Sequence, residues 1–418
     1  MNARYQMLSV SQTHENELSI ERQNSPLKTD QIQITKDIPN QEFQNIFVQF
    51  FLGQRLLQAY DKEKDLNYIT EIQYILGSIA KKSLISKETL LNLNVIQIAL
   101  KVLNLEIEYD DHCMLSLVYL ITTFVEIDTL TFSDQNKLLL LTILEKLCKK
   151  LLLINYLDLD IQQEESSNEI QYSLLSQIIY FLNLFISKSG LPFDLTKYQN
   201  IWKIIIQIAF LIQDVSSLQI SALQIIAEIL KQSDKQKLIV FQTNPQILFQ
   251  SLQVLENHID YNTINNCIRL QASLILKNLF SICNQEMIDD IHFNKIPFYF
   301  LELMKLEEHK KVFYHQIEAL YHLCNQSTFE QCIEIYENGL LSLIVSYLQE
   351  IKDTHNFVLC KNLLKLIQVI LEQSLNDEKL NAYFKQYNIQ QYLNEIIINC
   401  KNQNTVRRAT KILNYFNI

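Results

Sequence analysis

Glycine is nearly absent from this chain, which has only four glycines and five prolines in 418 residues. A protein of average composition would have about 29 and 21, from usages of about 7% and 5%. Phosphate-binding loops, tight hairpins and close approaches of two backbones all need glycine. The composition therefore excludes a nucleotide cradle, a meander of hairpins and a doubly wound sheet, and it favours a long succession of α-helices.

Apolar residues recur with the period of an α-helix. The spacing i, i+3, i+4, i+7 occurs within 272–283, 317–324 and 363–371, and it indicates helices with one buried stripe. Successive landmarks in the long apolar helices lie 45, 50, 47 and 43 residues apart, at Asn183, Glu228, Asn278, Asn325 and Gln368. Armadillo and HEAT repeats have periods of about 40–47 residues, so these units are expected to stack on their neighbours.

The predicted fold is all-α, a right-handed armadillo-repeat solenoid over residues 46–418. About eight or nine repeats of this period fit that length. Residues 1–45 are polar and without a clear helical period, so they are predicted to form a disordered tail. No linker rich in Pro, Gly or Ser follows the tail, which indicates one array rather than several compact domains.

Charge and hydropathy narrow the classes of partner. The formal net charge is −10, which argues against nucleic acid because that partner needs clustered Lys and Arg. An acidic groove would attract a basic peptide. The most apolar stretches, around 114–125 and 204–212, fall short of the roughly 18 residues that a spanning helix needs, so no membrane partner is expected. Without a secretory signal, the expected location is the cytoplasm and the nucleus.

No catalytic or metal-binding motif stands out. A Gly-rich loop, a G-x-S-x-G turn and a kinase signature are all missing, so we expect neither an enzyme nor a cofactor. His315 and His322 lie seven residues apart on one helical face, but metal sites use closer spacing or more ligands. The eight cysteines form no C-x-x-C pair and are expected to be buried, reduced thiols.

One repeat carries a resemblance to a known family. Residues 317–348 read IEALYHLCNQSTFEQCIEIYENGLLSLIVSYL, which resembles the armadillo repeats of importin alpha (karyopherin alpha), the adaptor that binds nuclear localisation signals. The residues in register are Glu318-Ala319, Asn325, Glu330-Gln331 and Gly339. Residues 271–304 match one repeat earlier through Ala272, Asn278 and Ile296-Pro297. The likeness is looser over 65–265 and absent before residue 45.

The resemblance implies a peptide-binding groove. In that family an Asn carboxamide, with both a donor and an acceptor, clamps the backbone of an extended peptide. A Trp four residues earlier holds the stem of a Lys or Arg by apolar and cation–π contact. The resemblance implies the following groove residues in this chain. Asn183, Asn278 and Asn325 would clamp the peptide backbone, Tyr321 would occupy a Trp position, and Glu228 would occupy a further clamp position.

Several positions depart from the family. The single Trp, Trp202, lies outside any slot, and Leu274 and Ile179 occupy two of the Trp positions. Each lost slot removes about 1–2 kcal/mol per bound cation. The family's amino-terminal segment is strongly basic, whereas residues 1–45 have four basic and six acidic residues. Binding to importin beta or to an export factor is therefore implied by the resemblance alone.

Two functions remain open at this point. One is an adaptor that binds basic nuclear localisation signals of cargo for import into the nucleus, and the other is a generic armadillo scaffold without signal recognition. The adaptor predicts that its groove residues line one face beside carboxylates, with Asn183, Asn278, Tyr321 and Asn325 together. The scaffold predicts that they scatter or are buried.

Overall fold

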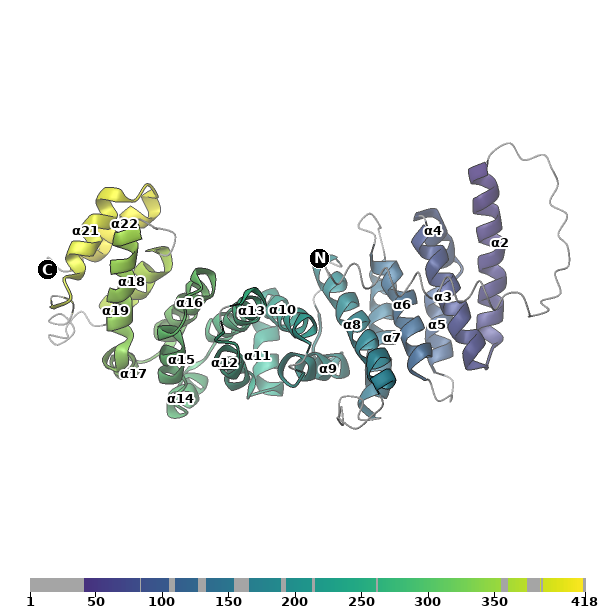
Figure 1. The fold of residues 1–418 in the computed structure, drawn as a ribbon, viewed down its shortest axis with the longest axis horizontal. Helices are drawn as coiled ribbons and strands as arrows, with labels where there is room; N and C mark the ends of the chain where they lie inside the picture. The colour runs from purple at the N-terminus through teal and green to yellow at the C-terminus, as the bar shows by residue number, and fades with distance from the viewer. Residues whose placement is uncertain are drawn as a thin grey trace. The chain divides into compact units, whose positions relative to one another are not determined.

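The computed structural model describes residues 41–418 except 83, 105–109, 127–132, 154–164, 189–192, 213–214, 261, 355–359, 374–383, 385 and 416–418. Packing of Cα atoms divides the chain into residues 1–48 and residues 49–418. Every regular element in the described part is helical, so the predicted all-α solenoid is confirmed. Figure 1 shows these elements along the chain.

The first half of the chain contributes helices of 9 to 24 residues. They are α2 (Gln41–Lys62), α3 (Leu66–Lys82), α4 (Leu84–Asn92), α5 (Val95–Leu103), α6 (Asp111–Val125), α7 (Asp134–Leu153), α8 (Glu165–Lys188), α9 (Gln199–Phe210) and α10 (Ser216–Gln232). Helix α2 begins at Gln41, so the prediction that residues 1–45 lack helical structure is wrong for residues 41–45. The rest of that predicted tail lies outside the described residues.

The second half repeats a three-helix unit. Its elements are α11 (Asp234–Thr243), α12 (Ile247–Asn257), α13 (Thr263–Phe280), α14 (Gln285–Phe293), α15 (Ile296–Lys305), α16 (Lys310–Gln326), α17 (Phe329–Ile335), the π-helix η1 (Tyr336–Leu340), α18 (Leu341–Thr354), α19 (Cys360–Gln373), α21 (Ile389–Asn399) and α22 (Gln403–Tyr415). The units α11–α13, α14–α16 and α17–α19 each have a short helix followed by two longer ones.

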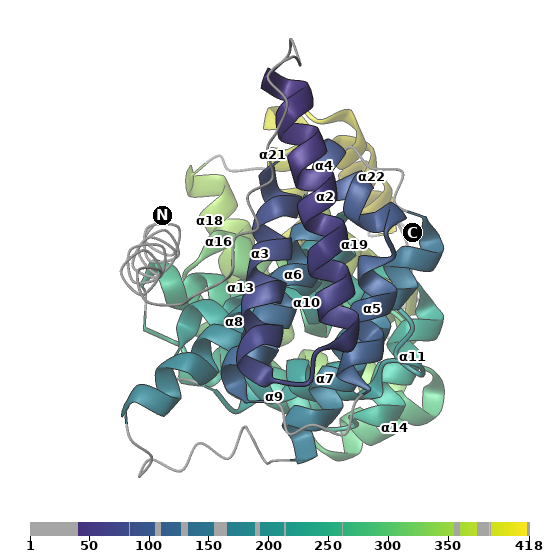
Figure 2. The ribbon, with the colours of Figure 1, turned by 90° about the vertical axis from the view of Figure 1, so that its right-hand side faces the viewer.

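Two rows of helices hold these units together. In the row that we call the main ladder, each helix packs on the next, in the order α3, α6, α8, α10, α13, α16, α19, α22. A second ladder runs through α5, α7, α9, α12 and α15, and then from η1 and α18 to α21. The main-ladder helices α13, α16 and α19 lie side by side in Figure 1, and α3, α6, α8 and α10 lie one behind another in Figure 2.

A left-handed residue marks the turn before several second-ladder helices. Asn94 precedes α5, Lys295 precedes α15 and Asn388 precedes α21, with φ of 61°, 55° and 53°. Gly339, at φ 117°, lies in η1 just before α18. A residue in this conformation ends one helix and lets the next begin at once. The junction therefore fixes where α5, α15, α18 and α21 start.

A buried ion pair joins two layers at the core. Arg269 of α13 lies 3.0 Å from Glu307, which follows α15, and each side chain is only 2% exposed. Glu307 also accepts a hydrogen bond from the backbone N–H of His309 at 2.8 Å. A buried charge pair of this kind needs such additional hydrogen bonds to offset its loss of hydration.

Helix α8 corrects one expectation about membranes. Residues Glu169–Ser187 are long and apolar enough to cross a membrane by length and composition, so the prediction that no segment reaches that length is wrong. More than half of its apolar side chains are buried between neighbouring helices of the main ladder, however, among them Leu175, Ile178 and Leu182. The hydropathy of α8 is therefore explained by its place in the core.

Candidate functional site

The main-ladder helices α13, α16 and α19 each leave one row of side chains partly exposed. The row follows the spacing i, i+3, i+4, i+7, because the rest of each helix is buried against its neighbours. On three successive helices this row forms what we call the ladder face, defined by Leu274 and Lys277 of α13, Glu318, Tyr321, His322 and Asn325 of α16, and Lys361, Lys365, Gln368 and Glu372 of α19.

Contacts between helices show that these rows are adjacent. Lys277 Nζ lies 2.9 Å from Glu318 Oε2, which joins α13 to α16. Lys365 Nζ lies 5.3 Å from the centre of the Tyr321 ring, which joins α16 to α19. Arg408 of α22 continues the row, because its Nη1 donates to Gln368 Oε1 at 3.3 Å. The ladder face is thus one connected polar surface across four helices.

Glu318 is ionised at the centre of this surface. Burial alone would raise its pKa, but the nearby His315 ring, whose Nδ1 lies 3.7 Å from Glu318 Oε2, the close contact with Lys277 and the charges of Lys277 and Lys365 outweigh burial, and the pKa is about 2. A carboxylate with such a pKa carries a full negative charge at neutral pH. Its charge is matched by cations of the same face.

His322 lies among cations. Burial lowers the pKa of His322, and the charges of Lys365, Lys277 and Lys237 lower it further, against the opposite effect of Glu318. Its ring makes an edge contact with Tyr321 at 5.1 Å between ring centres. At neutral pH this side chain is therefore an uncharged, half-buried imidazole within a positive field.

Two of the predicted groove residues lie on the ladder face at α16. Asn325 is exposed and Tyr321 is half-buried, one helical turn apart. No hydrogen bond of the Asn325 side chain occurs within the described part of the chain, whereas Tyr321 has Lys365 over its ring. The side chains expected for peptide binding are thus present here, with a lysine of the chain itself already at the aromatic position.

Asn278 lies deeper than a groove residue would. Its side chain is 7% exposed, and its Nδ2 donates to the backbone carbonyl of Ala227 on α10 at 3.2 Å. The carboxamide donor therefore joins two main-ladder helices. Lys277, one residue earlier and about 100° around the helix, occupies the open side instead.

The remaining predicted positions lie on earlier main-ladder helices. Asn183 is half-buried on α8, and Glu228 is half-buried on α10. Glu228 Oε1 lies 2.5 Å from Lys231 Nζ on the same helix. The Glu228 carboxylate is thus paired within its own helix, and no described contact links either residue to the group around Glu318.

Two tyrosines lie together on the first main-ladder helices. The rings of Tyr74 and Tyr119 lie 5.6 Å apart between α3 and α6. A Cβ at Gly77 would lie 2.6 Å from Tyr119, so the glycine allows this ring to pack on α3. Thr123, four residues after Tyr119, is buried, and its hydroxyl donates to the Leu120 carbonyl at 2.6 Å.

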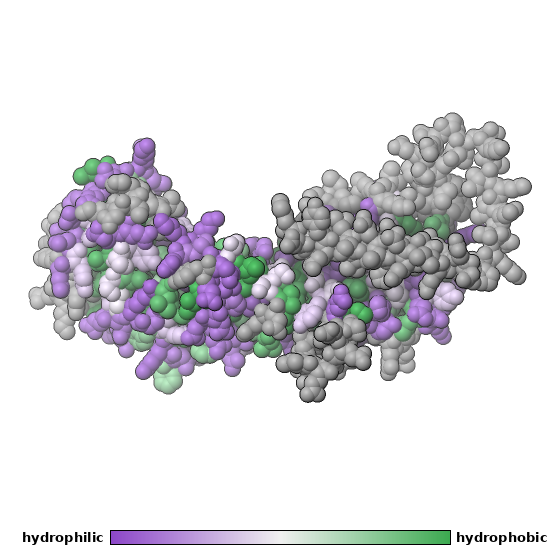
Figure 3. Space-filling view, viewed as in Figure 1, coloured by the Kyte–Doolittle hydropathy of each residue, from purple (hydrophilic) through white to green (hydrophobic). Residues whose placement is uncertain are grey.

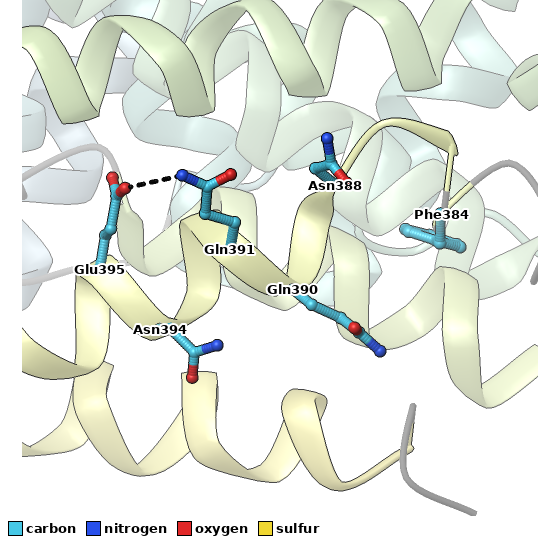
Figure 4. A pocket seen from close by; sticks show the side chains of 6 residues that line it. All are labelled: Phe384, Asn388, Gln390, Gln391, Asn394 and Glu395. Carbon is cyan, nitrogen blue, oxygen red and sulfur yellow. Dashed lines mark hydrogen bonds between the residues drawn. The ribbon is translucent and has the colours of Figure 1, made fainter.

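Other parts of the molecule offer less chemistry. Among the described residues no group of His, Cys, Asp and Glu could hold a metal ion. All eight cysteines are free thiols, but Cys267 is exposed, which corrects the expectation that all are buried. Figure 4 shows a hollow at α21 lined mostly by amide side chains, in which Gln391 Nε2 donates to Glu395 Oε1 at 3.4 Å. Apart from the Glu395 carboxylate, this lining has no group suited to acid–base or nucleophilic chemistry.

The exposed surface is polar over the carboxyl-terminal helices. In the space-filling view hydrophilic side chains predominate there, and apolar ones occur in small groups between them (Figure 3). A surface of this kind suits contacts by charge and hydrogen bonding more than burial of a large apolar patch.

Comparison with known proteins identifies the fold but no family. No protein-family model matches the sequence, and no curated protein matches it. Among solved structures, an engineered protein is similar with a TM-score of 0.51 and 13% identity, over 88% of this chain and 89% of that one. This likeness supports the fold alone, because so low an identity is no guide to a site.

Two designed armadillo repeat proteins are also similar. One, solved in complex with the peptide (KR)4, has a TM-score of 0.45 and 15% identity over 60% of this chain and 95% of that one. The other has a TM-score of 0.43 and 14% identity over 65% of this chain and 99% of that one. The three-helix units described above make this chain an all-α solenoid of armadillo-like layers.

Proposed function

We propose that this protein is a non-enzymatic interaction scaffold that binds an extended peptide segment of a partner protein along the ladder face of α13, α16 and α19. The observation that carries the proposal is the exposed Asn325 carboxamide, one turn from Tyr321 in a row that continues over neighbouring helices. A carboxamide offers both a donor and an acceptor, which matches the two hydrogen-bonding groups of a peptide unit.

The spacing of the helices suits an extended chain. Packed helices lie about 8–10 Å apart, and an extended chain advances about 3.3 Å per residue. A peptide crossing the ladder face would therefore place one side chain over each helix at every second or third residue. A compact ligand would meet only one helix and would leave the connected row of polar contacts unused.

Peptide binding by the full chain tests the scaffold. Fluorescence anisotropy with labelled peptides of neutral, acidic and basic composition would measure affinity, first for the wild type and then for Asn325→Ala. We expect at least one peptide to bind and Asn325→Ala to weaken that binding. Asn257→Ala, an exposed Asn on α12 of the second ladder, is the matched control. Equal binding by both variants would contradict the proposed place of the peptide.

An importin-alpha-like adaptor is the second candidate, favoured by the Asn325 and Tyr321 pair and by ionised Glu318 beside it. In that case the occupant is a basic nuclear localisation signal, and the protein moves between cytoplasm and nucleus with importin beta or an export factor. The Nδ2 of Asn278 is engaged by Ala227, and Lys365 lies over Tyr321, so a basic ligand would have to compete with both contacts.

A pull-down with a classical basic signal peptide tests this adaptor. We expect the wild type to retain the peptide and the double variant Asn278→Ala/Asn325→Ala to lose it. Equal recovery would eliminate the import role and would leave the general scaffold intact. Microscopy of the tagged chain in cells tests the proposed location in cytoplasm and nucleus.

A further inference from the structure

The ladder face has more positive charge than its own carboxylates neutralise. Glu318 is paired with Lys277 at 2.9 Å, and Glu372 of α19 is paired with Lys411 at 3.0 Å. Glu372 also accepts hydrogen bonds from Gln368 at 2.7 Å and from the Tyr415 hydroxyl at 3.1 Å. Both carboxylates are therefore paired with lysines of the chain itself.

Three cations of the same face have no such partner. No carboxylate of the described part of the chain lies within ion-pair distance of Lys361, Lys365 or Arg408. Their charges are close enough to act on one another: burial lowers the pKa of Lys365, Glu318 opposes this effect, and the positive charges of Lys361 and Arg408 lower the pKa further. The surplus of charge on α19 and α22 is thus positive, although the whole chain has a net charge of −10.

We propose that the partner segment is acidic and that its carboxylates are bound by Lys361, Lys365 and Arg408 on α19 and α22. This inference rests on the proposed peptide-binding function and names the chemical class of its ligand. The backbone of the segment would meet Asn325, and an anionic side chain above Lys365 would lie beside the rings of Tyr321 and His322.

The charge distribution distinguishes this ligand from a nucleic acid. A single strand carries one phosphate per about 3.4 Å. The cations of the ladder face, by contrast, alternate with the carboxylates of Glu318 and Glu372. Both carboxylates stay ionised, because hydrogen bonds and neighbouring lysines lower the pKa of each below its usual value despite burial. A continuous polyanion would meet both carboxylates. A peptide with an acidic residue at about every third position can place its charges over the cations and neutral side chains over the carboxylates.

The same distribution disfavours a basic segment. A lysine or arginine of a partner would approach three cations without an internal partner, and the two carboxylates that could attract it are already paired. Like charges brought together at an interface weaken binding and select against such partners. Specificity for an acidic segment therefore follows from the chain's own ion pairs.

Fluorescence anisotropy of the full chain tests the inference with three labelled peptides of equal length, which have Glu, Gln or Lys at every third position. We expect the Glu peptide to bind at least about tenfold more tightly than the Gln peptide, since charge-assisted hydrogen bonds add about that much. Lys365→Gln and Arg408→Gln should each weaken binding of the Glu peptide about tenfold. Circular dichroism would verify that each variant keeps its helices, and Lys361→Gln, at an exposed position, provides a third test.

The control is Lys305→Gln on α15, a lysine already paired with Glu302 at 2.6 Å. It should leave binding unchanged. Equal affinity for the Glu and Gln peptides, or loss of affinity with Lys305→Gln but not with Lys365→Gln, would overturn the inference. So would tighter binding of a single-stranded oligonucleotide that depends on the same residues. Binding of only the Gln or Lys peptide would refute the acidic ligand and keep the scaffold, whereas no binding by any peptide would refute both.

Discussion

Removing the charge of Glu318 should loosen the packing of α13 against α16 in a way that depends on pH. Its pKa is about 2, compared with 4.5 for an ordinary Glu. A difference of about 2.5 units corresponds to at most about 3 kcal/mol of stability at pH 7. Glu318→Gln keeps an oxygen that can accept from Lys277 but removes the charge. We therefore expect the variant to lose about 2–3 kcal/mol in this region.

The sign of the pH dependence follows from the lowered pKa. The stabilisation by Glu318 is fully present above the pKa of the unfolded chain, near 4.5, and is lost as the pH falls toward the folded pKa of about 2. The difference between wild type and Glu318→Gln should accordingly be largest at pH 7 and should fall to less than about half of that value by pH 3.

Hydrogen exchange followed by mass spectrometry measures this locally. The ratio of variant to wild-type exchange rates at one pH cancels the intrinsic rate, and a loss of about 2–3 kcal/mol predicts exchange about 30- to 150-fold faster in α13 and α16 at pH 7. Glu302→Gln, which affects an exposed pair with Lys305, is the control and should change exchange by about twofold or less. Unchanged exchange in Glu318→Gln at pH 7, or an equal effect at pH 3, would refute the reasoning.

Three further outcomes are expected. Lys295→Gly should stabilise the protein by about 0.5 kcal/mol, measured as a higher midpoint of urea unfolding, because the left-handed conformation at φ 55° costs a non-Gly residue more than the entropy that glycine loses. Glu307→Leu should destabilise by about 3–5 kcal/mol, since it leaves Arg269 buried without its counter-charge, and Arg269→Leu/Glu307→Leu should recover most of this loss in the same assay. The affinity for an acidic peptide should rise from pH 8 to pH 6. In the free protein the pKa of His322 is below its usual value, and a bound carboxylate would raise it, so that binding takes up a proton. His322→Gln should abolish this rise in affinity.

The fold could be predicted because its signals are local. A helical period of apolar residues and the scarcity of glycine exclude most alternatives to stacked helices. Gly339, selected as part of one repeat, indeed lies at a junction that requires positive φ. The equivalent junctions at Asn94, Lys295 and Asn388 could not be recognised, since these residue types also occur in ordinary turns and inside helices.

The site could be predicted only in part because it depends on contacts between repeats. Tyr321 and Asn325 lie on the ladder face as the register of α16 suggested. Asn278 differs from Lys277 by one step around the helix, and that step decides which side chain is buried. Lys365 contacts Tyr321, which lies 44 positions earlier in the sequence, and Arg408 contacts Gln368, which lies 40 positions earlier. The two separations differ because the connections between the helices differ in length. No motif within a single helix reports such a pairing.

The left-handed junction also bears on how such a chain can change in length during evolution. Because it sets the start of α5, α15, α18 and α21 from within its own unit, a duplicated or deleted stretch that runs from the junction before α15 to the junction before α18 would bring its correct starting geometry with it. Gain or loss of a whole unit should thus be tolerated far better than gain or loss of a few residues inside one. The natural step of variation for this protein would be one junction-to-junction segment, such as the 44 residues from Lys295 to Asn338, just before Gly339.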